Sequence, residues 1–391
     1  MEIRTAVVGI GNIGTAHATA LRDHLIEGMS LAAVCDINEE RLHAAETQFP
    51  DAKRYSCIDD LLKDESVEAV IISTPHPFHA ELAVQALRSG RHVLVEKPID
   101  IRLSQAKRLC DAAKESECKF AIMLNQRTDP IFRRAREIVR SGALGALKRS
   151  VWIITNWYRT QHYYDSGSWR ATWAGEGGGV LLNQAPHNMD LWQWIVGMPT
   201  HVRGFCDVAK YHRIEVEDEA TLMTRYPGGA TGLFITTTGE YPGTNRLEIS
   251  GELGKIVIEN GILTHWRLEQ NEREIRFASV ENFAKIPYTV ETFAPGEPGD
   301  GHIGILINFS DAIRNGAELI SPGQDGVNEL TLSNAAYLSS WEGNIEIALP
   351  IDNDRFNALL DERVSQSTGI KTTAKSKIPT GSYSERWQVK W

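Results

Sequence analysis

The sequence has few cysteines, and they form no recognisable pattern. The five cysteines are scattered and include no C-x-x-C pair. An odd, unpatterned set argues against a disulfide framework and against a structural zinc site, so we expect reduced thiols and no metal. The residues are Cys35, Cys57, Cys110, Cys118 and Cys206.

Long apolar runs and an excess of positive charge are also lacking. No apolar run is long enough to span a bilayer, and the chain enters an expected strand at once, which argues against a signal peptide. We therefore expect a cytoplasmic protein without a membrane anchor. The formal net charge of −10 argues against nucleic acid as a partner, because phosphate backbones need a basic face. A small anionic ligand bound at one site remains compatible with this net charge.

What is present is an ordinary globular composition, with 42% hydrophobic and 24% charged residues. A chain of 391 residues is too long for a single core, so we expect two domains. A change in the sequence pattern divides them into residues 1–126 and residues 127–391.

A glycine-rich turn follows the first expected strand. Residues 9–14 read G-I-G-N-I-G between an apolar run and a helical pattern. Glycines allow the turn to approach a pyrophosphate, which the helix N-terminus stabilises. Asp36 ends the second expected strand, where an acidic residue binds the ribose of NAD and repels the 2′-phosphate of NADP. We therefore expect NAD; the alternative for Asp36 is a structural turn carboxylate.

Strands alternate with helices up to residue 126, which predicts an α/β, doubly wound parallel sheet. Polar residues follow several of these strands, at the edge where a dinucleotide binds. The alternative for His79 is that it packs at the start of a helix and does not bind the cofactor. The expected cofactor-binding residues are Gly9, Gly11, Asn12, Ile13, Gly14, Asp36, Ser73, Thr74, His76, His79, Glu96, Lys97 and Asn125.

The stretch 92–98 reads H-V-L-V-E-K-P and places a charged pair at the end of a buried strand. Such a pair is costly to desolvate, and Pro98 ends the strand and keeps Lys97 extended. We expect Lys97 to project into an active site. The alternative is a surface salt bridge between Glu96 and Lys97.

The second domain has a different texture, with alternating, aromatic-rich segments separated by turn signals. This predicts a large, mostly antiparallel sheet with helices on one face. Trp387 and Trp391 suggest that the last residues dock on the protein. The expected strands are 148–157, 201–208, 219–226, 230–237, 246–250, 255–259, 262–268 and 273–278.

Residues 156–190 form the densest polar and aromatic region. Asn183, His187 and Asp190 have a spacing that places them on one face if the segment is helical. Tryptophan together with arginine is typical of a sugar site. The alternatives are that the tryptophans belong to the core, that His187 is a buried histidine, and that Arg159 and Arg170 form interface salt bridges. The candidate substrate-binding residues are Asn183, Arg127, Trp157, Arg159, Trp169, Arg170 and His302.

Together these motifs resemble the glucose–fructose oxidoreductase/inositol dehydrogenase/MocA (Gfo/Idh/MocA) family over nearly the whole chain. The motifs are the glycine-rich turn, Thr74-Pro75 with His79, Glu96-Lys97-Pro98, and Gly178-Gly179 with Asn183, His187 and Asp190. The resemblance implies a Rossmann domain and an α/β domain with an open antiparallel sheet that forms homodimers or homotetramers. It also implies catalytic roles for Lys97 and His187 and a cis Lys97–Pro98 bond.

One departure from the family motif concerns position 183. The family usually has aspartate where this chain has Asn183. An amide can bind a substrate hydroxyl but cannot accept a proton, so the acid–base role moves to His187 and Lys97, with His187 favoured as the proton acceptor.

The resemblance implies NAD-dependent oxidation of a secondary hydroxyl of a sugar, anhydrosugar or cyclitol by hydride transfer. Two alternatives stay open. The same site can oxidise a sugar transiently and drive elimination or deglycosylation, or the chain can be a non-catalytic dinucleotide-binding sensor.

Overall fold

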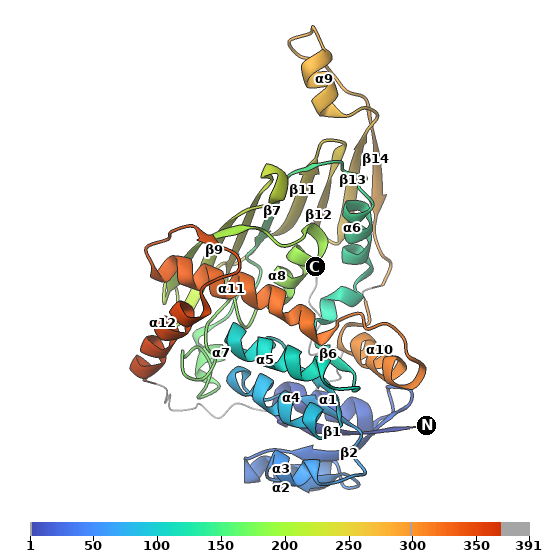
Figure 1. Ribbon diagram of the computed structural model, residues 1–391, viewed down its shortest axis with the longest axis vertical. Coiled ribbons are helices and arrows are strands. Elements are labelled where there is room, and N and C mark those ends of the chain that lie inside the picture. The colour runs from blue at the N-terminus through green and yellow to red at the C-terminus, as the bar shows by residue number, and fades with distance from the viewer. Residues whose placement is uncertain (1, 298, 369–391) are drawn as a thin grey trace.

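The computed structural model describes residues 2–297 and 299–368 (Figure 1). The expected docking of Trp387 and Trp391 lies outside the described residues. Among the described helices, none combines the length and the apolar character needed to cross a bilayer.

The N-terminal part forms a six-stranded parallel sheet in the order β3-β2-β1-β4-β5-β6. This confirms the predicted doubly wound sheet, with its strand order reversing next to β1. The strands are β1 (Ile3–Val8), β2 (Met29–Cys35), β3 (Lys53–Tyr55), β4 (Ala69–Ile72), β5 (His92–Val95) and β6 (Phe120–Ile122). The helices are α1 (Asn12–Arg22), α2 (Glu39–Gln48), α3 (Ile58–Leu62), α4 (His79–Arg88) and α5 (Leu103–Lys114), with 3₁₀ turns His76–Phe78 and Asn125–Thr128.

The central strands of this sheet are buried on both faces, as the continuous apolar runs predicted. In β4, Val70 and Ile72 join the core that includes α4 and α5, whereas Ala69 and Ile71 join a second core. That second core includes α1 and the helix α10 (Gly301–Asn315). A helix from the C-terminal half thus packs on the N-terminal sheet, while the predicted division at residue 126 stays a prediction.

The second sheet has nine strands in the order β14-β13-β12-β11-β7-β10-β9-β8-β15. Among the described strands of this second sheet, only β7 and β10 pair in parallel, so the predicted mostly antiparallel sheet is confirmed. The strands are β7 (Leu147–Ile154), β8 (His201–Val208), β9 (Glu217–Arg225), β10 (Thr231–Thr237), β11 (Asn245–Gly251), β12 (Gly254–Glu259), β13 (Ile262–Leu268), β14 (Tyr288–Phe293) and β15 (Ile347–Ala348).

Helices cover one face of this sheet, where Trp152, Leu222, Phe234 and Leu247 form the core. The helix α11 lies across the middle of the molecule, between the two sheets (Figure 1). The remaining helices are α6 (Pro130–Arg140), α7 (Gln161–Asp165), α8 (Pro186–Val196), α9 (Glu272–Ala278), α11 (Gly326–Trp341) and α12 (Asn353–Gln366), with 3₁₀ turns Pro227–Gly229 and Gly323–Asp325.

The strand predicted over 273–278 is wrong, because these residues form α9. The side chain of Asn271 accepts a hydrogen bond from the backbone N–H of Arg273 and caps the helix, and Glu272 and Glu274 lie favourably in its first turn. The sequence analysis also missed β14. The helix α9 sits at the tip of the β13–β14 hairpin, away from the body of the molecule (Figure 1).

Candidate active site

The glycine-rich turn connects β1 to α1 at the carboxyl edge of the parallel sheet. Gly9 has a φ of +86°, and a Cβ on it would lie 2.7 Å from the Ser73 carbonyl oxygen. A Cβ on Gly14 would lie 1.8 Å from the Gly9 carbonyl oxygen, whereas one on Gly11 would meet open space. Positions 9 and 14 therefore fit only glycine, and the open side of the turn at Gly11, with the α1 N-terminus, suits a pyrophosphate.

Asp36 lies beside this turn, directly after β2. Its Oδ2 accepts a hydrogen bond from the backbone N–H of Ile10 at 2.9 Å, and its Oδ1 accepts one from Asn38 at 2.9 Å. Arg41 Nη1 also lies 3.2 Å from Oδ2. Arg41 was not expected at this place, because the four intervening residues gave no reason to place its side chain at the carboxylate.

Buried polar atoms without partners line the same edge of the sheet. Within the described residues, the hydroxyls of Ser73 and Thr74 and Oδ1 of Asn125 are buried and have no hydrogen-bond partner. Buried polar groups are normally satisfied, so these atoms fit a ligand with polar groups. The residues of this edge thus fit a dinucleotide.

His76 and His79 connect the loops around this edge. His76 Nδ1 lies 3.1 Å from the Glu176 carbonyl oxygen. His79 lies between two carbonyl oxygens, with Nδ1 2.7 Å from that of Pro98 and Nε2 2.7 Å from that of Thr74. These contacts agree with the packing alternative for His79, and its cofactor contact stays a prediction.

Glu96 and Lys97 follow β5, and the Lys97–Pro98 bond is cis, as the resemblance implied. Glu96 does not form the surface salt bridge considered from the sequence, because its buried carboxylate bonds His17 Nε2 at 2.8 Å. Burial opposes ionisation of Glu96, yet the His17 contact holds its pKa at about 2. Lys97 Nζ instead donates to the Asn183 carbonyl oxygen at 2.8 Å. Burial lowers the pKa of Lys97.

His187 is the second residue of α8, and Asn183 lies in the turn before this helix. The predicted shared helical face therefore begins only at Pro186. Lys97, Asn183 and His187 are partly exposed, whereas most residues next to them are buried. Lys97 contacts Asn183 and its charge acts on His187, and we call the partly exposed surface of these three side chains the opening. His187 Nδ1 is buried without a partner among the described residues, and burial lowers the pKa of His187 well below its usual range.

A buried carboxylate holds the turn that carries Asn183. Glu217, on β9, accepts hydrogen bonds from the backbone N–H groups of Gly179 at 2.9 Å and Leu181 at 2.9 Å. The hydroxyl of Tyr337, on α11, donates to the same carboxylate at 2.7 Å. The sequence analysis missed Glu217, because it lies in an ordinary strand pattern far from the turn.

Glu176 also contacts Asn183. Its Oε1 accepts a hydrogen bond from Asn183 Nδ2, and its Oε2 accepts one from the backbone N–H of Ala171 at 2.5 Å. The sequence analysis did not select Glu176. Its only signal in the sequence is that it is the one acidic residue within the glycine-rich stretch 175–179. Its spacing from Asn183 does not correspond to a helix or a strand.

Aromatic and guanidinium groups surround Tyr163 next to Asn183. The Arg170 guanidinium lies 4.7 Å from the Tyr163 ring and 4.9 Å from the Trp169 ring. Arg159 lies 5.1 Å from the Tyr163 ring. The structure thus brings Trp169, Arg170 and Arg159 together, while Trp157 is 8% exposed and lies mostly in the core.

His302 lies in the first turn of α10, next to Asn125. Its Nδ1 is 3.2 Å from Asn125 Nδ2, and its ring centroid is 6.1 Å from that of His17. Burial lowers the pKa of His302 to about 4. His302 therefore adjoins Asn125 and the His17–Glu96 pair, and its predicted substrate contact stays a prediction.

Arg127 lies in the core, and its predicted substrate contact stays a prediction. It is 1% exposed and donates to both Asp190 oxygens, at 2.8 and 2.6 Å. A third contact joins it to Asp325 at 2.6 Å. Arg127 and Asp190 therefore form a buried ion pair beneath the site, because each charge needs the other in the core.

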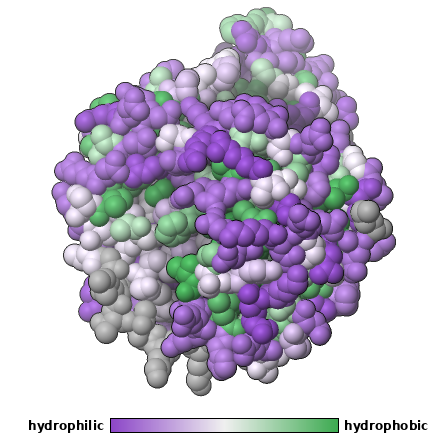
Figure 2. Space-filling view, turned by 60° about the horizontal axis from the view of Figure 1, so that its bottom comes forward, coloured by the Kyte–Doolittle hydropathy of each residue, from purple (hydrophilic) through white to green (hydrophobic). Residues whose placement is uncertain are grey.

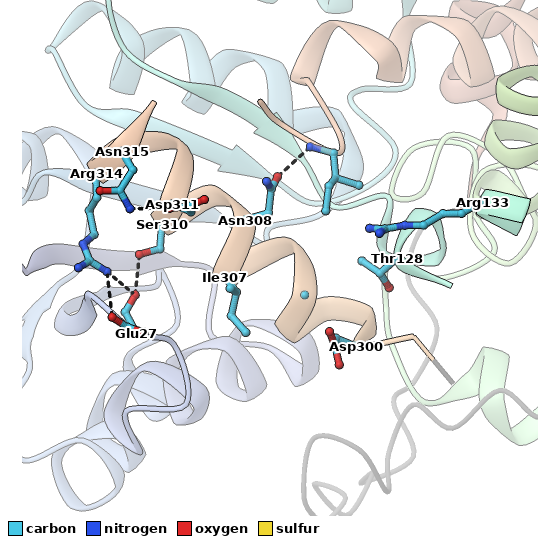
Figure 3. Close-up of a pocket in the computed structure, with 12 residues that line it drawn as sticks. Glu27, Thr128, Arg133, Asp300, Ile307, Asn308, Ser310, Asp311, Arg314 and Asn315 are labelled. Atoms are coloured by element: carbon cyan, nitrogen blue, oxygen red, sulfur yellow. Dashed lines mark hydrogen bonds and ion pairs between the residues drawn. The ribbon is translucent and has the colours of Figure 1, made fainter. Parts of the chain in front are cut away.

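A separate cavity of about 480 Å³ runs along α10 (Figure 3). Its described lining includes Thr128 and Asp300 but neither Lys97 nor His187. Several of its polar side chains bond to one another or to nearby backbone, such as Asn315 with Asp311 at 2.5 Å. This cavity is distinct from the opening bordered by the candidate catalytic residues.

Comparisons with known proteins agree with both parts of the fold. Residues 3–124 match the model of an oxidoreductase family with an NAD-binding Rossmann fold, and residues 132–257 match the GFO/IDH/MocA C-terminal domain. The myo-inositol 2-dehydrogenase of Thermotoga maritima is 26% identical over 348 residues, which cover 87% of this chain and 97% of that protein.

Two further matches bear on the chemistry. A glycosyl hydrolase family 109 protein of Shewanella sp. (strain W3-18-1) is 26% identical over 273 residues, 66% of this chain and 55% of that protein. The solved structure of the WlbA dehydrogenase from Bordetella pertussis, in complex with NADH and UDP-GlcNAcA, aligns with a TM-score of 0.74 and 28% identity. It covers 90% of this chain and 100% of that chain.

Proposed function

Because this chain belongs to the Gfo/Idh/MocA family of NAD-binding oxidoreductases, we propose that it oxidises a secondary hydroxyl of a sugar, anhydrosugar or cyclitol by hydride transfer. The observation that supports this most is the opening bordered by Lys97, Asn183 and His187, next to the dinucleotide-binding edge. The named dehydrogenases among its relatives act on the same class of CH–OH group.

Bound NAD would supply the hydride acceptor. We prefer it to NADP because Asp36 follows β2 beside the glycine turn, where an acidic residue binds the ribose of NAD. The chain's own part is to bind the hydroxyl and to take its proton. Lys97 Nζ has one bond to Asn183 O, which leaves two of its positions toward a ligand. His187 can reach the same hydroxyl through Nε2, since its Nδ1 is enclosed.

We place proton acceptance on Lys97, which differs from the preference for His187 drawn from the sequence. Burial lowers the pKa of Lys97 toward the range in which an amine can act as a base. A protonated His187 would carry an N–H at Nδ1 that has no acceptor among the described residues. His187 then orients the hydroxyl as a hydrogen-bond partner.

A screen of sugars, anhydrosugars and cyclitols for NADH formation tests this proposal. We expect absorbance of NADH to rise with at least one substrate and the Lys97→Ala variant to abolish most of the rise. A substrate that is converted equally well by the Lys97→Ala variant would contradict the proposal.

A second candidate function, deglycosylation through transient oxidation, is favoured by the similarity to the glycosyl hydrolase family 109 protein. The same residues would serve it, because oxidation of one carbon acidifies the neighbouring C–H bond. Release of an aglycone from a glycoside without net NADH formation would support this alternative, whereas stoichiometric NADH would support the dehydrogenase.

We further propose a cytoplasmic homodimer or homotetramer formed through the second sheet. Its uncovered face carries Val151, Ile153 and Ile235 partly exposed and Met223 52% exposed, and such a face favours a partner surface. Figure 2 shows hydrophobic residues at the projecting tip of the molecule and, in smaller patches, across the rest of a mainly hydrophilic face. Light scattering after size exclusion should give two or four chains; a monomer at micromolar concentration would contradict this.

A further inference from the structure

The side chain of Glu176 is enclosed although it lies next to the opening. It is 1% exposed, and both of its carboxylate oxygens accept a hydrogen bond from an N–H donor. Ala171 N–H donates to Oε2 at 2.5 Å and Asn183 Nδ2 donates to Oε1. Burial raises the pKa of Glu176, and Arg170 and these two donors oppose the shift. In its ionised form the carboxylate has only acceptors, so it then requires a donor from position 183.

This contact decides which way the Asn183 amide points. The nitrogen must face Glu176, because an amide oxygen there would be repelled by the carboxylate. The second N–H of the same nitrogen points to the Tyr163 hydroxyl at 3.4 Å. Asn183 is itself partly exposed, so its Oδ1, which neither Glu176 nor Tyr163 engages, is the acceptor that this side chain can offer to a ligand.

We propose that Glu176 is a positioning residue that fixes the Asn183 amide so that Oδ1 accepts a hydrogen bond from a substrate hydroxyl. In this arrangement, which rests on the proposed function, a carboxylate lies at position 176 behind a neutral amide at position 183. The substrate class follows from it: a polyhydroxylated molecule with a hydroxyl donor next to the one that Lys97 binds.

Exchanging the acid and the amide provides a direct test. In Glu176→Gln, the Gln oxygen still accepts from Ala171 N–H, so the Gln nitrogen faces Asn183. The Asn183 amide then has to turn its oxygen inward and present a donor to the substrate. In Asn183→Asp, two carboxylates meet, and one of them has to bind a proton.

The double variant Glu176→Gln/Asn183→Asp restores the pairing of a hydrogen-bond donor with an acceptor between positions 176 and 183. The Gln oxygen accepts from Ala171 N–H, the Gln nitrogen donates to the new carboxylate, and the second oxygen of that carboxylate faces the substrate as an acceptor. Each single variant should lower kcat/KM by at least about tenfold and raise KM, because a polar group in the site loses its hydrogen-bond partner. The double variant should recover at least about tenfold over either single variant.

The controls separate positioning from folding. Glu274→Gln changes an exposed glutamate on α9 and should leave kcat and KM unchanged. NADH affinity, measured by fluorescence titration, should be the same in all variants, because Glu176 acts on Asn183 and not on the cofactor edge. Single variants with full activity, a double variant that gains nothing, or a parallel loss of NADH affinity would each overturn the proposal.

A stability measurement keeps this test separate from the proposed function. Urea unfolding of the four proteins measures the coupling between positions 176 and 183 without any substrate. Recovery of stability in the double variant supports the contact between Glu176 and Asn183. If the screen then finds no oxidised substrate, the proposed function fails while this contact remains supported. Additive stability losses overturn the pair, whatever the enzyme oxidises.

Discussion

Lys97 Nζ donates a hydrogen bond to the main-chain carbonyl oxygen of Asn183 at 2.8 Å. This bond joins the end of β5 in the parallel sheet to the turn before α8, 86 residues further along the chain. The position of the ammonium group is thereby set by two segments that are distant in sequence. A main-chain acceptor also keeps the bond independent of which side chain occupies position 183.

Replacing Lys97 by alanine should lower kcat by about 10²–10⁴-fold, because it removes the group that we propose takes the proton. NADH affinity should stay within a few fold, since the glycine turn and Asp36 are untouched. Steady-state kinetics with a substrate from the screen and a fluorescence titration measure the two effects. Lys114→Ala, at an exposed position on α5, is the matched control. Retained turnover in Lys97→Ala would refute the mechanism.

The pH dependence of oxidation should report Lys97. The deprotonated amine is the reactive form, so kcat/KM should rise with pH through a pKa below 10.5, in the direction that burial shifts it. His187 has a pKa well below 6.5, so it is already neutral at pH 7 and adds no limb above that pH. A pH profile of kcat/KM checks this. A limb near pH 6.5 that vanishes in His187→Asn would return proton acceptance to His187.

The parallel sheet and its ligand edge were predictable because their signals are local. An apolar run, a glycine turn and an acidic residue at the next strand end each follow from a few neighbouring residues. The cis bond after Lys97 was expected through the resemblance and is confirmed. Helix α9 was predicted wrongly as a strand, because residues 272–278 show enough alternation to mimic one while the cap at Asn271 decides the outcome.

The contacts between distant segments were not predictable from local pattern. Arg127 and Asp190 are 63 residues apart, and an arginine beside a catalytic turn looks the same in sequence whether it binds a ligand or a buried aspartate. Glu176 and Asn183 are separated by an irregular turn that has no fixed period. The family motif identified the departure at position 183, but only the folded turn shows the carboxylate that faces it.

Replacing Asp36 by alanine should shift the cofactor preference from NAD toward NADP. The change removes the carboxylate that would repel a 2′-phosphate, and it frees Arg41, whose Nη1 lies 3.2 Å from Asp36 Oδ2. We expect KM for NAD to rise by about tenfold or more and KM for NADP to fall, since one lost charge contact is worth about 1.5–3 kcal/mol. Kinetics with both cofactors measure the ratio.

The control for this change is Arg41→Ala in the Asp36→Ala background. It should cancel the gain for NADP, because the guanidinium is the group left to bind the phosphate. An Asp36→Ala enzyme whose preference for NAD is unchanged would show that the Asp36 carboxylate only closes the turn through Ile10 and Asn38.

Replacing Arg127 by methionine should destabilise the fold and leave substrate recognition alone. The change leaves Asp190 buried without its cation, and both side chains are 1% exposed, so the free energy of unfolding should fall by about 3–5 kcal/mol at pH 7. The loss should shrink as the pH falls, because a protonated Asp190 no longer needs the cation. Urea unfolding at several pH values measures this.

Arg134→Met, at a position whose side chain is 44% exposed, should cost less than about 1 kcal/mol. Asp190→Asn should restore part of the stability of Arg127→Met. An Arg127→Met protein that unfolds like the wild type but has a raised KM would instead establish Arg127 as a substrate-binding residue, as its sequence position suggested.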